Sequence, residues 1–326
     1  MPPPSKIHRC AILDDYQDVA LKMADFASLA GAVEFTVFNR PLGSPAEIAR
    51  ALRDFEMVVL TRERTAFPKQ VIDALPNLRL IVSTGARNPS LDVAAARARG
   101  VLVCNTPTAG NPTAQIAVAL ILEVTRRVGY ESDRLKRGEF WQSTIGPDLE
   151  GKTFGTIGLG RLGSRVANVC KAIGMKAIAW SQNLTAERCR EAGVEFAGSK
   201  EELLRAADIV SIHVVSSART RGLIGAKELA LMKPTAYLIN TARGPIVDEA
   251  ALVEALRNHK IAGAGLDVFD VEPLPVDHPL RKLDNVVLSP HLGYVTQENF
   301  RVSYGGVVED IRAFVDGKPI RVVEPA

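Results

Sequence analysis

The sequence predicts an α/β fold with two parallel sheets. Its 326 residues are enough for about two domains of roughly 150 residues each. Short apolar runs rich in β-branched residues alternate with stretches of helical spacing, once from residue 7 and again from residue 153. Strands that are apolar along nearly their whole length indicate parallel pairing, because helices cover both faces of such sheets.

The first series contains predicted strands at residues 7–13, 33–38, 57–61, 78–83 and 101–104. The helices predicted between them cover residues 17–29, 45–52, 68–75 and 91–99. Several of these helices open with Ser, Pro or Asp near the first turn, as helices commonly do. The segment 105–112 then holds two prolines and a glycine, which indicates a linker.

A long apolar helix is predicted after the linker, at residues 113–127, and the second series starts at Thr153. Its strands are predicted at residues 153–158, 176–180, 209–214, 236–240, 262–268 and 285–288. Its helices are predicted at residues 161–173, 186–192, 200–206, 226–232 and 248–257. A last helix, at residues 296–315, either caps the second series or returns to complete the first.

Composition argues against nucleic-acid and membrane partners. The chain is 47% hydrophobic and 24% charged, and its net charge is +3, without a long run of one sign. A nucleic-acid-binding surface usually needs a clear excess of basic residues. The best apolar run, residues 116–122, is far shorter than the about 20 residues of a membrane-spanning helix.

The N-terminus and the cysteines predict a cytoplasmic protein. The first eight residues contain no apolar stretch of the kind found in a secretory signal. The four cysteines show neither CxxC nor other ligand-like spacing, so we expect reduced thiols, no disulfide and no metal site.

A glycine motif marks the start of the second series. Gly158, Gly160 and Gly163 form a GxGxxG that follows an apolar strand and opens an apolar helix. The first glycine permits the tight turn, the second lets the backbone approach a pyrophosphate, and the third allows close packing of helix and strand. The free N–H groups of the helix N-terminus then favour the phosphates. We therefore predict a dinucleotide site here.

The choice between NAD and NADP stays open. NAD sites usually place Asp or Glu at the end of the next strand, to bind the ribose hydroxyls. Here that strand ends in Ser181-Gln182-Asn183, with no acid and no adjacent arginine for a 2′-phosphate. Ser181 is the candidate contact to the ribose.

Three ionisable residues follow later strands of the second series, each in a loop with Gly or Pro. They are Arg243, Glu272 and His291. The carboxyl ends of parallel strands meet at one edge of the sheet, where ligands bind. Arginine can hold a carboxylate through two hydrogen bonds, histidine can transfer a proton near neutral pH, and a carboxylate can orient that histidine. The set suits a keto acid, although a surface ion pair and a structural loop histidine are the alternatives.

The motifs resemble those of the D-isomer-specific 2-hydroxyacid dehydrogenases. GLGRLG, NTARGPIVDE, GLDVFDVEP and SPHLG occur in the order of that family's signature segments, and residues 84–88, TGARN, extend the resemblance into the first series. The resemblance implies two Rossmann-like doubly wound domains, with the cofactor domain inserted in the substrate domain. We expect residues 1–104 and 295–326 to form the substrate domain and residues 105–294 the dinucleotide-binding domain, so the last helix returns to the first series.

The resemblance also implies residue roles. Arg243 would bind the substrate carboxylate, His291 would donate the proton and Glu272 would be its partner. Backbone amides at Ala86 and Arg87 would also hold the carboxylate. The expected cofactor contacts are Gly158, Gly160, Arg161, Leu162, Gly163, Ser181, His213, Thr241, Ala242 and Asp267. Among these, Arg161 and Leu162 would meet the pyrophosphate, His213 the adenine, and the last three the nicotinamide.

The predicted function is hydride transfer between a nicotinamide cofactor and a small 2-keto or D-2-hydroxy acid. The alternative is an NAD(H)-sensing binding protein, similar to the family's corepressors, without significant turnover. A formate-dehydrogenase-like activity is disfavoured, because that relative carries Gln at the Glu272 position. Departures from the family pattern at Gln115, Val214–Val215 and Tyr294 leave the identity of the substrate open. The helix at 113–127 is apolar all round, and the resemblance implies a homodimer built around it.

Overall fold

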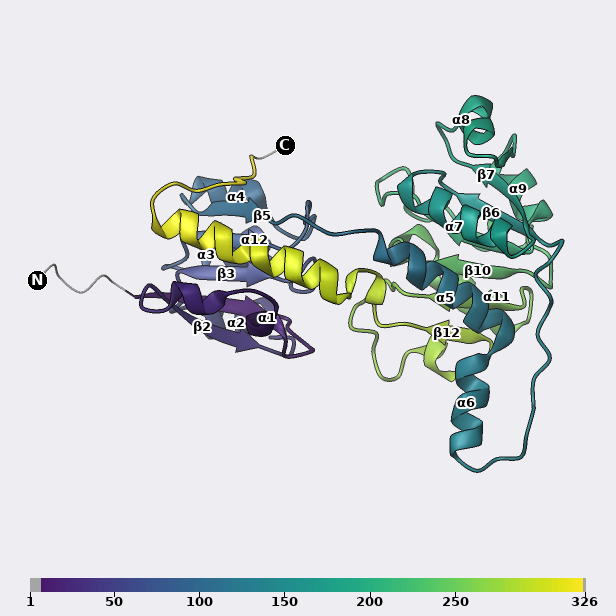
Figure 1. Ribbon diagram of the computed structural model, residues 1–326, viewed down its shortest axis with the longest axis horizontal. Coiled ribbons are helices and arrows are strands. Elements are labelled where there is room, and N and C mark those ends of the chain that lie inside the picture. Colours follow the sequence, from purple (N-terminus) through teal and green to yellow (C-terminus); the bar gives the residue numbers. More distant parts are fainter. Residues whose placement is uncertain (1–6, 325–326) are drawn as a thin grey trace, which may run out of the picture. The chain divides into compact units, whose positions relative to one another are not determined.

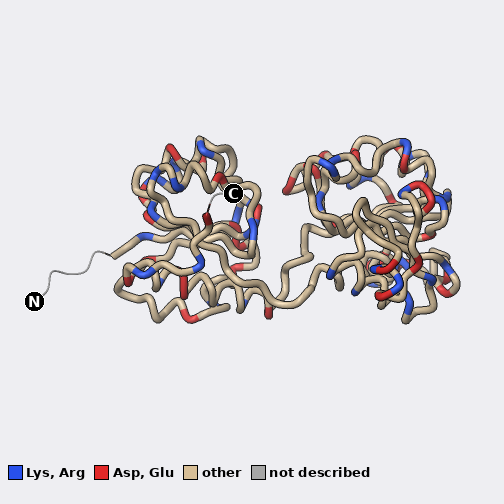
Figure 2. The backbone as a smooth tube through the Cα atoms, turned by 90° about the horizontal axis from the view of Figure 1, so that it is seen from above, with Lys and Arg blue, Asp and Glu red and all other residues tan. Residues whose placement is uncertain are grey.

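The computed structural model describes residues 7–324, which form two compact units (Figure 1). The first unit comprises the described residues up to Gly110 together with those from Thr296 onward, and the second unit is Asn111–Val295. Residues 1–6, on which the prediction of a cytosolic start partly rests, lie outside the described part of the chain. Basic and acidic residues are interspersed along both units (Figure 2).

The first unit has a five-stranded parallel sheet with the order β2-β1-β3-β4-β5. Its strands are β1 (His8–Leu13), β2 (Val33–Phe38), β3 (Met57–Leu60), β4 (Leu80–Ser83) and β5 (Leu102–Asn105). Its helices are α1 (Ala20–Met23), the 3-10 helix η1 (Phe26–Leu29), α2 (Pro45–Leu52), α3 (Lys69–Asp73), α4 (Val93–Ala98) and α12 (Gln297–Val315). Every residue of the central strands β3 and β4 is buried, as expected for strands covered on both faces.

The last helix belongs to the first unit. α12 packs against α1 and β4, and the segment after it pairs with β5 through a bridge between Cys104 and Val322 (Figure 1). Tyr304, on α12, is almost completely buried. The second unit is therefore inserted between two parts of the first, which confirms the predicted fold class.

The second unit has a seven-stranded parallel sheet with the order β12-β11-β10-β9-β6-β7-β8. Its strands are β6 (Thr153–Ile157), β7 (Lys176–Trp180), β8 (Glu195–Phe196), β9 (Ile209–Ile212), β10 (Tyr237–Asn240), β11 (Gly263–Leu266) and β12 (Val286–Leu288). Its α-helices are α5 (Pro112–Arg126), α6 (Val128–Lys136), α7 (Arg161–Ala172), α8 (Ala186–Glu191), α9 (Lys200–Ala206), α10 (Ala226–Leu229) and α11 (Glu249–Arg257). Three 3-10 helices complete it: η2 (Gly244–Ile246), η3 (Pro279–Lys282) and η4 (Leu292–Tyr294).

One predicted helix differs from the structure, and two elements of the structure were not predicted. The helix predicted at 17–29 is wrong as one element, because Asp25 lies between α1 and η1 and its carboxylate accepts the Ser28 N–H at the start of η1. The strand β8 is only two residues long and was not predicted. α6 was also missed, since it contains no buried residue and so has no apolar periodicity.

Other global features can be stated for residues 7–324. No helix in this range is long and apolar enough to cross a membrane. Within it, no group of three or more His, Cys, Asp or Glu side chains could hold a metal ion. All four cysteines are free and buried. The cytoplasmic location stays a prediction.

Candidate active site

The glycine turn after β6 has no room for side chains at two of its three glycines. Gly158 has a φ of +101°, and a Cβ atom there would lie 2.8 Å from the carbonyl oxygen of His213. A Cβ atom on Gly163 would lie 2.0 Å from the carbonyl oxygen of Gly158. The turn therefore needs glycine at both positions, for backbone conformation and for the packing of α7 against the strand.

Gly160 differs, because the space beside it is open. Apart from its two chain neighbours, no described residue has an atom within 4 Å of the position of a Cβ atom on Gly160. In the described part of the chain, no side chain caps the N-terminus of α7, which Gly160 precedes. The helix is 12 residues long, so its first N–H groups and its dipole offer a site for an anion. The geometry fits the pyrophosphate of a dinucleotide.

A second feature of this sheet edge also suits a ligand. The Thr241 hydroxyl, directly after β10, is buried and has no hydrogen-bond partner among residues 7–324. The Asn240 side chain shapes the same loop, because it accepts from the Ala242 N–H at 3.0 Å and donates to the Arg243 carbonyl at 3.0 Å. A buried polar atom usually has a partner, so a ligand atom at Thr241 would complete this site.

His213 lies beside the glycine turn, at the end of β9. Its Nε2 is 2.9 Å from the Ser211 hydroxyl. Burial lowers the pKa of His213 to about 4, so the imidazole is neutral at physiological pH. A neutral ring beside Gly158 is compatible with the predicted contact to adenine.

The Asp267 carboxylate anchors the loop that carries His291. It is fully buried directly after β11 and accepts from the Ser289 hydroxyl at 2.6 Å, the Leu292 N–H at 2.7 Å and the Gly293 N–H at 2.9 Å. Burial raises the pKa of Asp267, and these hydrogen bonds oppose that shift. His291 itself adopts the left-handed conformation, with a φ of +54°. The anchor therefore holds an unusual backbone turn in place.

His291 and Glu272 are in direct contact. The Nδ1 atom of His291 lies 2.7 Å from Oε2 of Glu272, and both side chains are largely buried. The other carboxylate oxygen, Oε1, accepts the Phe269 N–H at 2.9 Å. With Nδ1 engaged, the imidazole is left with Nε2 for exchange of a proton with another group.

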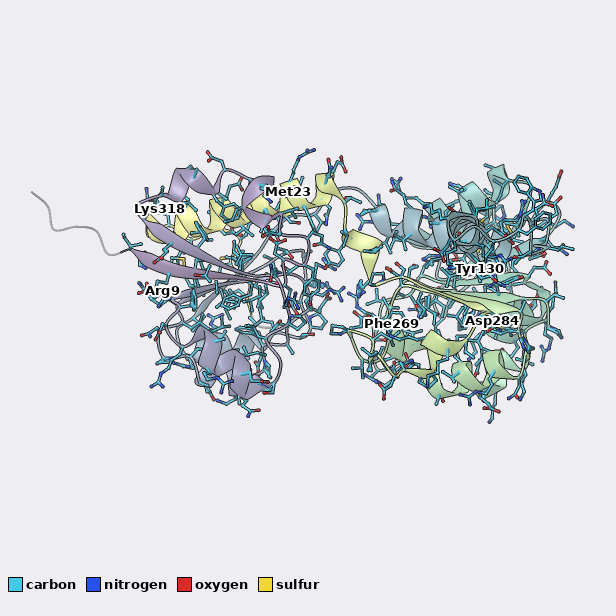
Figure 3. All side chains as sticks on the ribbon, turned by 90° about the horizontal axis from the view of Figure 1, so that it is seen from below. Arg9, Met23, Tyr130, Phe269, Asp284 and Lys318 are labelled. Atoms are coloured by element: carbon cyan, nitrogen blue, oxygen red, sulfur yellow. The ribbon has the colours of Figure 1, made fainter. Side chains whose placement is uncertain are left out.

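The loops of Arg243 and Glu272 meet through their backbones. A Cβ atom on Gly244 would lie 2.1 Å from the carbonyl carbon of Phe269, which is labelled in Figure 3. Arg243, Glu272 and His291 follow β10, β11 and β12, which are neighbours in the sheet. The structure thus gathers the three predicted catalytic residues at one edge, the edge that also carries the glycine turn.

Comparison with known proteins identifies the family. The model of the D-isomer specific 2-hydroxyacid dehydrogenase NAD binding domain matches residues 118–293. A glyoxylate reductase from Aeropyrum pernix is 43% identical over 258 residues, which are 76% of each chain. The chain belongs to the D-isomer specific 2-hydroxyacid dehydrogenase family.

Other relatives of this dehydrogenase family agree. A D-3-phosphoglycerate dehydrogenase from Archaeoglobus fulgidus is 39% identical over 282 residues, but the match spans only 53% of that longer protein. The crystal structure of a putative D-3-phosphoglycerate dehydrogenase from Ralstonia solanacearum superposes with a TM-score of 0.91 over 97% of both chains, at 33% identity. Membership confirms the predicted class: an oxidoreductase that acts on CH–OH groups with NAD(P).

Two further predicted site residues, Ala86 and Arg87, lie in the first unit, whereas Arg161, Leu162 and Ser181 lie in the second. Ala86 and Arg87 are exposed in the loop after β4, at the carboxyl edge of the five-stranded sheet. Gly85, with a φ of +93°, begins this loop and donates its N–H to the Thr106 hydroxyl. The Ala86 carbonyl accepts from Asn105 at 2.9 Å. These contacts fix the loop whose amides were predicted to hold the substrate carboxylate.

Sequence reasoning missed two supporting residues of the dehydrogenase site. Asn240 and Gly244 shape the loops of Arg243 and Glu272, as described above. An Asn at a strand end and a Gly directly after a candidate arginine were visible signals. Their partners were not, because those partners depend on how the strands lie side by side.

Proposed function

We propose that this chain reduces a small 2-keto acid to the D-2-hydroxy acid, and catalyses the reverse oxidation, with NAD or NADP. The observation that carries the proposal is the 2.7 Å contact between His291 Nδ1 and Glu272 Oε2, at the sheet edge that also holds Arg243 and the glycine turn. Glyoxylate reductases and D-3-phosphoglycerate dehydrogenases among the relatives support a substrate of this class.

In this proposal each residue has a defined role. Arg243 binds the substrate carboxylate through paired hydrogen bonds and stabilises the negative charge that develops on the keto oxygen. His291 donates the proton from Nε2 to that oxygen, while Glu272 holds Nδ1 and favours the protonated ring. The amides at Ala86 and Arg87 are also proposed to bind a carboxylate. The nicotinamide, when bound, supplies the hydride.

The proposed domain roles follow from the same sites. Residues 105–294 bind the dinucleotide, through the glycine turn with Arg161 and Leu162, the loop of Thr241 and Ala242, and Asp267. Residues 1–104 and 295–326 form the substrate domain. At the ribose, Ser181 is the candidate contact, because neither an acid nor an arginine directly follows β7. The preference between NAD and NADP is therefore measured by comparing NADH with NADPH in the assay.

Steady-state kinetics test the activity. Purified protein is assayed with glyoxylate, hydroxypyruvate, pyruvate and the keto acid of 3-phosphoglycerate, each with NADH and with NADPH. We expect turnover with at least one of these keto acids. Tight NADH binding without turnover on the whole panel would instead support the NAD(H)-sensing binding protein.

We also propose a homodimer, formed by α5, α6 and the segment after α6. This arm exposes several large apolar side chains: Leu122, Val128, Tyr130, Leu135, Phe140, Trp141 and Ile145. Tyr130 is labelled in Figure 3. An apolar surface of this kind favours a protein partner, and its continuity with the predicted dimer helix indicates a second copy of the chain.

The arm has a defined conformation that suits an interface. Glu131 accepts hydrogen bonds from the Ser143 N–H and hydroxyl at 3.1 and 2.8 Å, and from the Thr144 hydroxyl at 2.6 Å. These bonds lower the pKa of Glu131 to about 2. Light scattering should give a dimer mass for the wild type, and Trp141→Glu should give a monomer that still binds NADH. A monomeric wild type at micromolar concentration would contradict the dimer.

A further inference from the structure

Glu249 grips the loop that carries Glu272 at two points. This residue opens α11, and its Oε2 accepts the Asp270 N–H at 3.2 Å. Its Oε1 lies 3.0 Å from Nε2 of His278, further along the same loop. The side chains of Glu249 and His278 are only 18% and 17% exposed. The contacts are therefore well shielded from solvent.

The hydrogen bonds of His278 fix where its proton lies. Its Nδ1 accepts the Leu280 N–H at 3.3 Å, so this nitrogen carries no proton in the observed arrangement. The proton is therefore on Nε2, which donates to Glu249. Both groups that face the Glu249 carboxylate are donors, and a carboxylate can accept from both at once. A glutamine keeps one acceptor oxygen but places an NH₂ donor where the other oxygen was, so it opposes one of these two donors.

Two carboxylates hold neighbouring peptide groups of the same turn. The Phe269 N–H donates to Glu272, and the Asp270 N–H donates to Glu249. Gly244 also lies close to this turn, since a Cβ atom on it would lie 2.1 Å from the Phe269 carbonyl carbon and 2.5 Å from the Asp270 nitrogen. A shift of the turn at Asp270 would therefore move Phe269, and with it the carboxylate that contacts His291.

Charged groups of both signs surround the contacts that Glu249 makes with Asp270 and His278. Burial raises the pKa of Asp270, and the neighbouring Glu249 and Asp248 raise it further, whereas Arg221 and His278 oppose the shift. Near His291, the acidic groups are Glu272, which contacts its Nδ1, and Asp267. The hydrogen bonds to the loop therefore fix the position of the Glu249 carboxylate, although the like-charged Asp248 and Asp270 lie nearby.

We infer that Glu249 and His278 form a positioning pair that holds Glu272 against His291. The inference rests on the proposed role of His291 as the proton donor. Glu249 touches neither substrate nor cofactor in this proposal. It acts through the turn at residues 269–270, and its loss weakens the contact between Glu272 and His291 without removing either residue.

The test compares Glu249→Gln with wild type, Glu272→Gln and the double variant. We expect the rate constant kcat for keto-acid reduction to fall roughly 3- to 10-fold in Glu249→Gln, the equivalent of one hydrogen bond, with KM for NADH unchanged. The pH above which reduction declines should move lower, in the same direction as in Glu272→Gln. The double variant should move no further than Glu272→Gln alone.

A second readout needs neither substrate nor cofactor. In the apoprotein, NMR of the histidine side chains should show His291 losing its proton at lower pH in Glu249→Gln than in wild type. The matched control is Glu228→Gln, because Glu228 also accepts a backbone N–H, from Gly225, and pairs with Lys200, away from this loop. It should leave the His291 titration unchanged.

The outcomes separate the two proposals. A His291 titration that moves in Glu272→Gln but not in Glu249→Gln would overturn the positioning pair and leave the proposed activity intact. A titration that moves in neither variant would instead refute the role of Glu272. If Glu249→Gln does not fold, His278→Phe tests the same contact, since it keeps a ring of similar shape but removes the nitrogen that donates to Glu249, while Glu249 stays in place.

Discussion

The two units use the same β–α turn in opposite ways. In the first unit, β1 leads into Asp14 and Asp15, and the Asp15 carboxylate accepts the N–H groups of Val19 and Ala20 at 3.1 and 2.8 Å. In the second unit, β6 leads into the glycine turn, and no side chain caps α7. The protein's own carboxylate thus occupies in one unit the kind of position that is open in the other.

The difference shows why two similar sheets serve different purposes. In the first unit the turn is closed further by Thr65 and Tyr16, which donate to Asp14 at 2.7 and 3.2 Å. Burial raises the pKa of Asp14, and the helix that follows, α1, has only four residues. In the second unit glycines and a 12-residue helix leave donors for a phosphate. Fold alone therefore does not identify the cofactor site; the turn does.

The largest expected effect contrasts two His–Glu pairs. His291 pairs with Glu272 at the carboxyl edge of the second sheet, whereas His8 pairs with Glu56 at the amino edge of the first. Removal of the proton donor typically costs about 10²- to 10⁴-fold in rate. We expect His291→Asn to lower kcat by this factor and His8→Asn to change it by less than about 2-fold, because a first-unit pair at the amino edge has no catalytic task. Equal losses in steady-state kinetics would remove the distinction.

A substitution at Gly160 should make the second turn resemble the first. Gly160→Asp places a carboxylate at the N-cap of α7, where space is open and φ is −83°. An aspartate is favoured at this helix position, so the variant should be at least as stable as wild type. Its charge should repel the pyrophosphate, and we expect NADH affinity to fall by about 100-fold or more by calorimetry.

The controls for this substitution separate charge from size. Gly160→Asn has the same shape without the charge and should weaken NADH less than Gly160→Asp does. Gly160→Ala should have the smallest effect of the three, since no atom lies within 4 Å of a Cβ atom there. Unchanged NADH affinity in Gly160→Asp would show that the open turn is not the phosphate site.

The next prediction concerns the charge of Glu272. Glu272→Gln keeps the shape of the side chain but removes the negative charge that favours protonated His291. The pH profile of reduction should therefore decline at lower pH than in wild type, and oxidation should become possible at lower pH. Profiles measured in both directions check this shift. If the reduction limb stays where it is in wild type, Glu272 is not the partner of the proton donor.

The smallest expected effect is a pH dependence of stability with opposite sign in the two units. The pKa of His213, in the second unit, is lowered from 6.5 to about 4, so stability is lost as pH falls through this range. Burial raises the pKa of Asp310, in the first unit, from 3.8 to about 6, and Glu309 adds to this shift, whereas the hydrogen-bonded Arg321 opposes it. The stabilisation of the first unit by protonated Asp310 is therefore present at low pH and is lost as the pH rises towards 6.

Hydrogen exchange, which resolves the two units, measures this contrast. When the pH is lowered from 7.5 to 5, the free energy of unfolding of the second unit should fall by about 2 kcal/mol more in wild type than in His213→Gln. Over the same pH interval, the free energy of unfolding of the first unit should rise by about 1 kcal/mol in wild type relative to Asp310→Asn. Changes of the same sign in both units would contradict the assigned protonation states.

The features that depend on local sequence pattern can be predicted from the amino-acid sequence. Alternating apolar strands and helices predicted both parallel sheets, and the spacing of Gly158, Gly160 and Gly163 predicted the dinucleotide turn. The order of four motifs predicted the family, and Arg243, Glu272 and His291 were named as candidates. These signals are readable because strand and helix periodicity, and the need for glycine in a tight turn, act over a few neighbouring residues.

Only the three-dimensional structure shows which side chains are hydrogen-bond partners. It showed that Asp267 anchors the turn after His291, and that Glu272 divides its two oxygens between Phe269 and His291. It also revealed the grip of Glu249 on the same loop. These contacts join residues that follow or precede different strands, so they form only once the strands are aligned in the sheet. Local periodicity carries no information about such pairs, because their distances depend on the path of the whole chain.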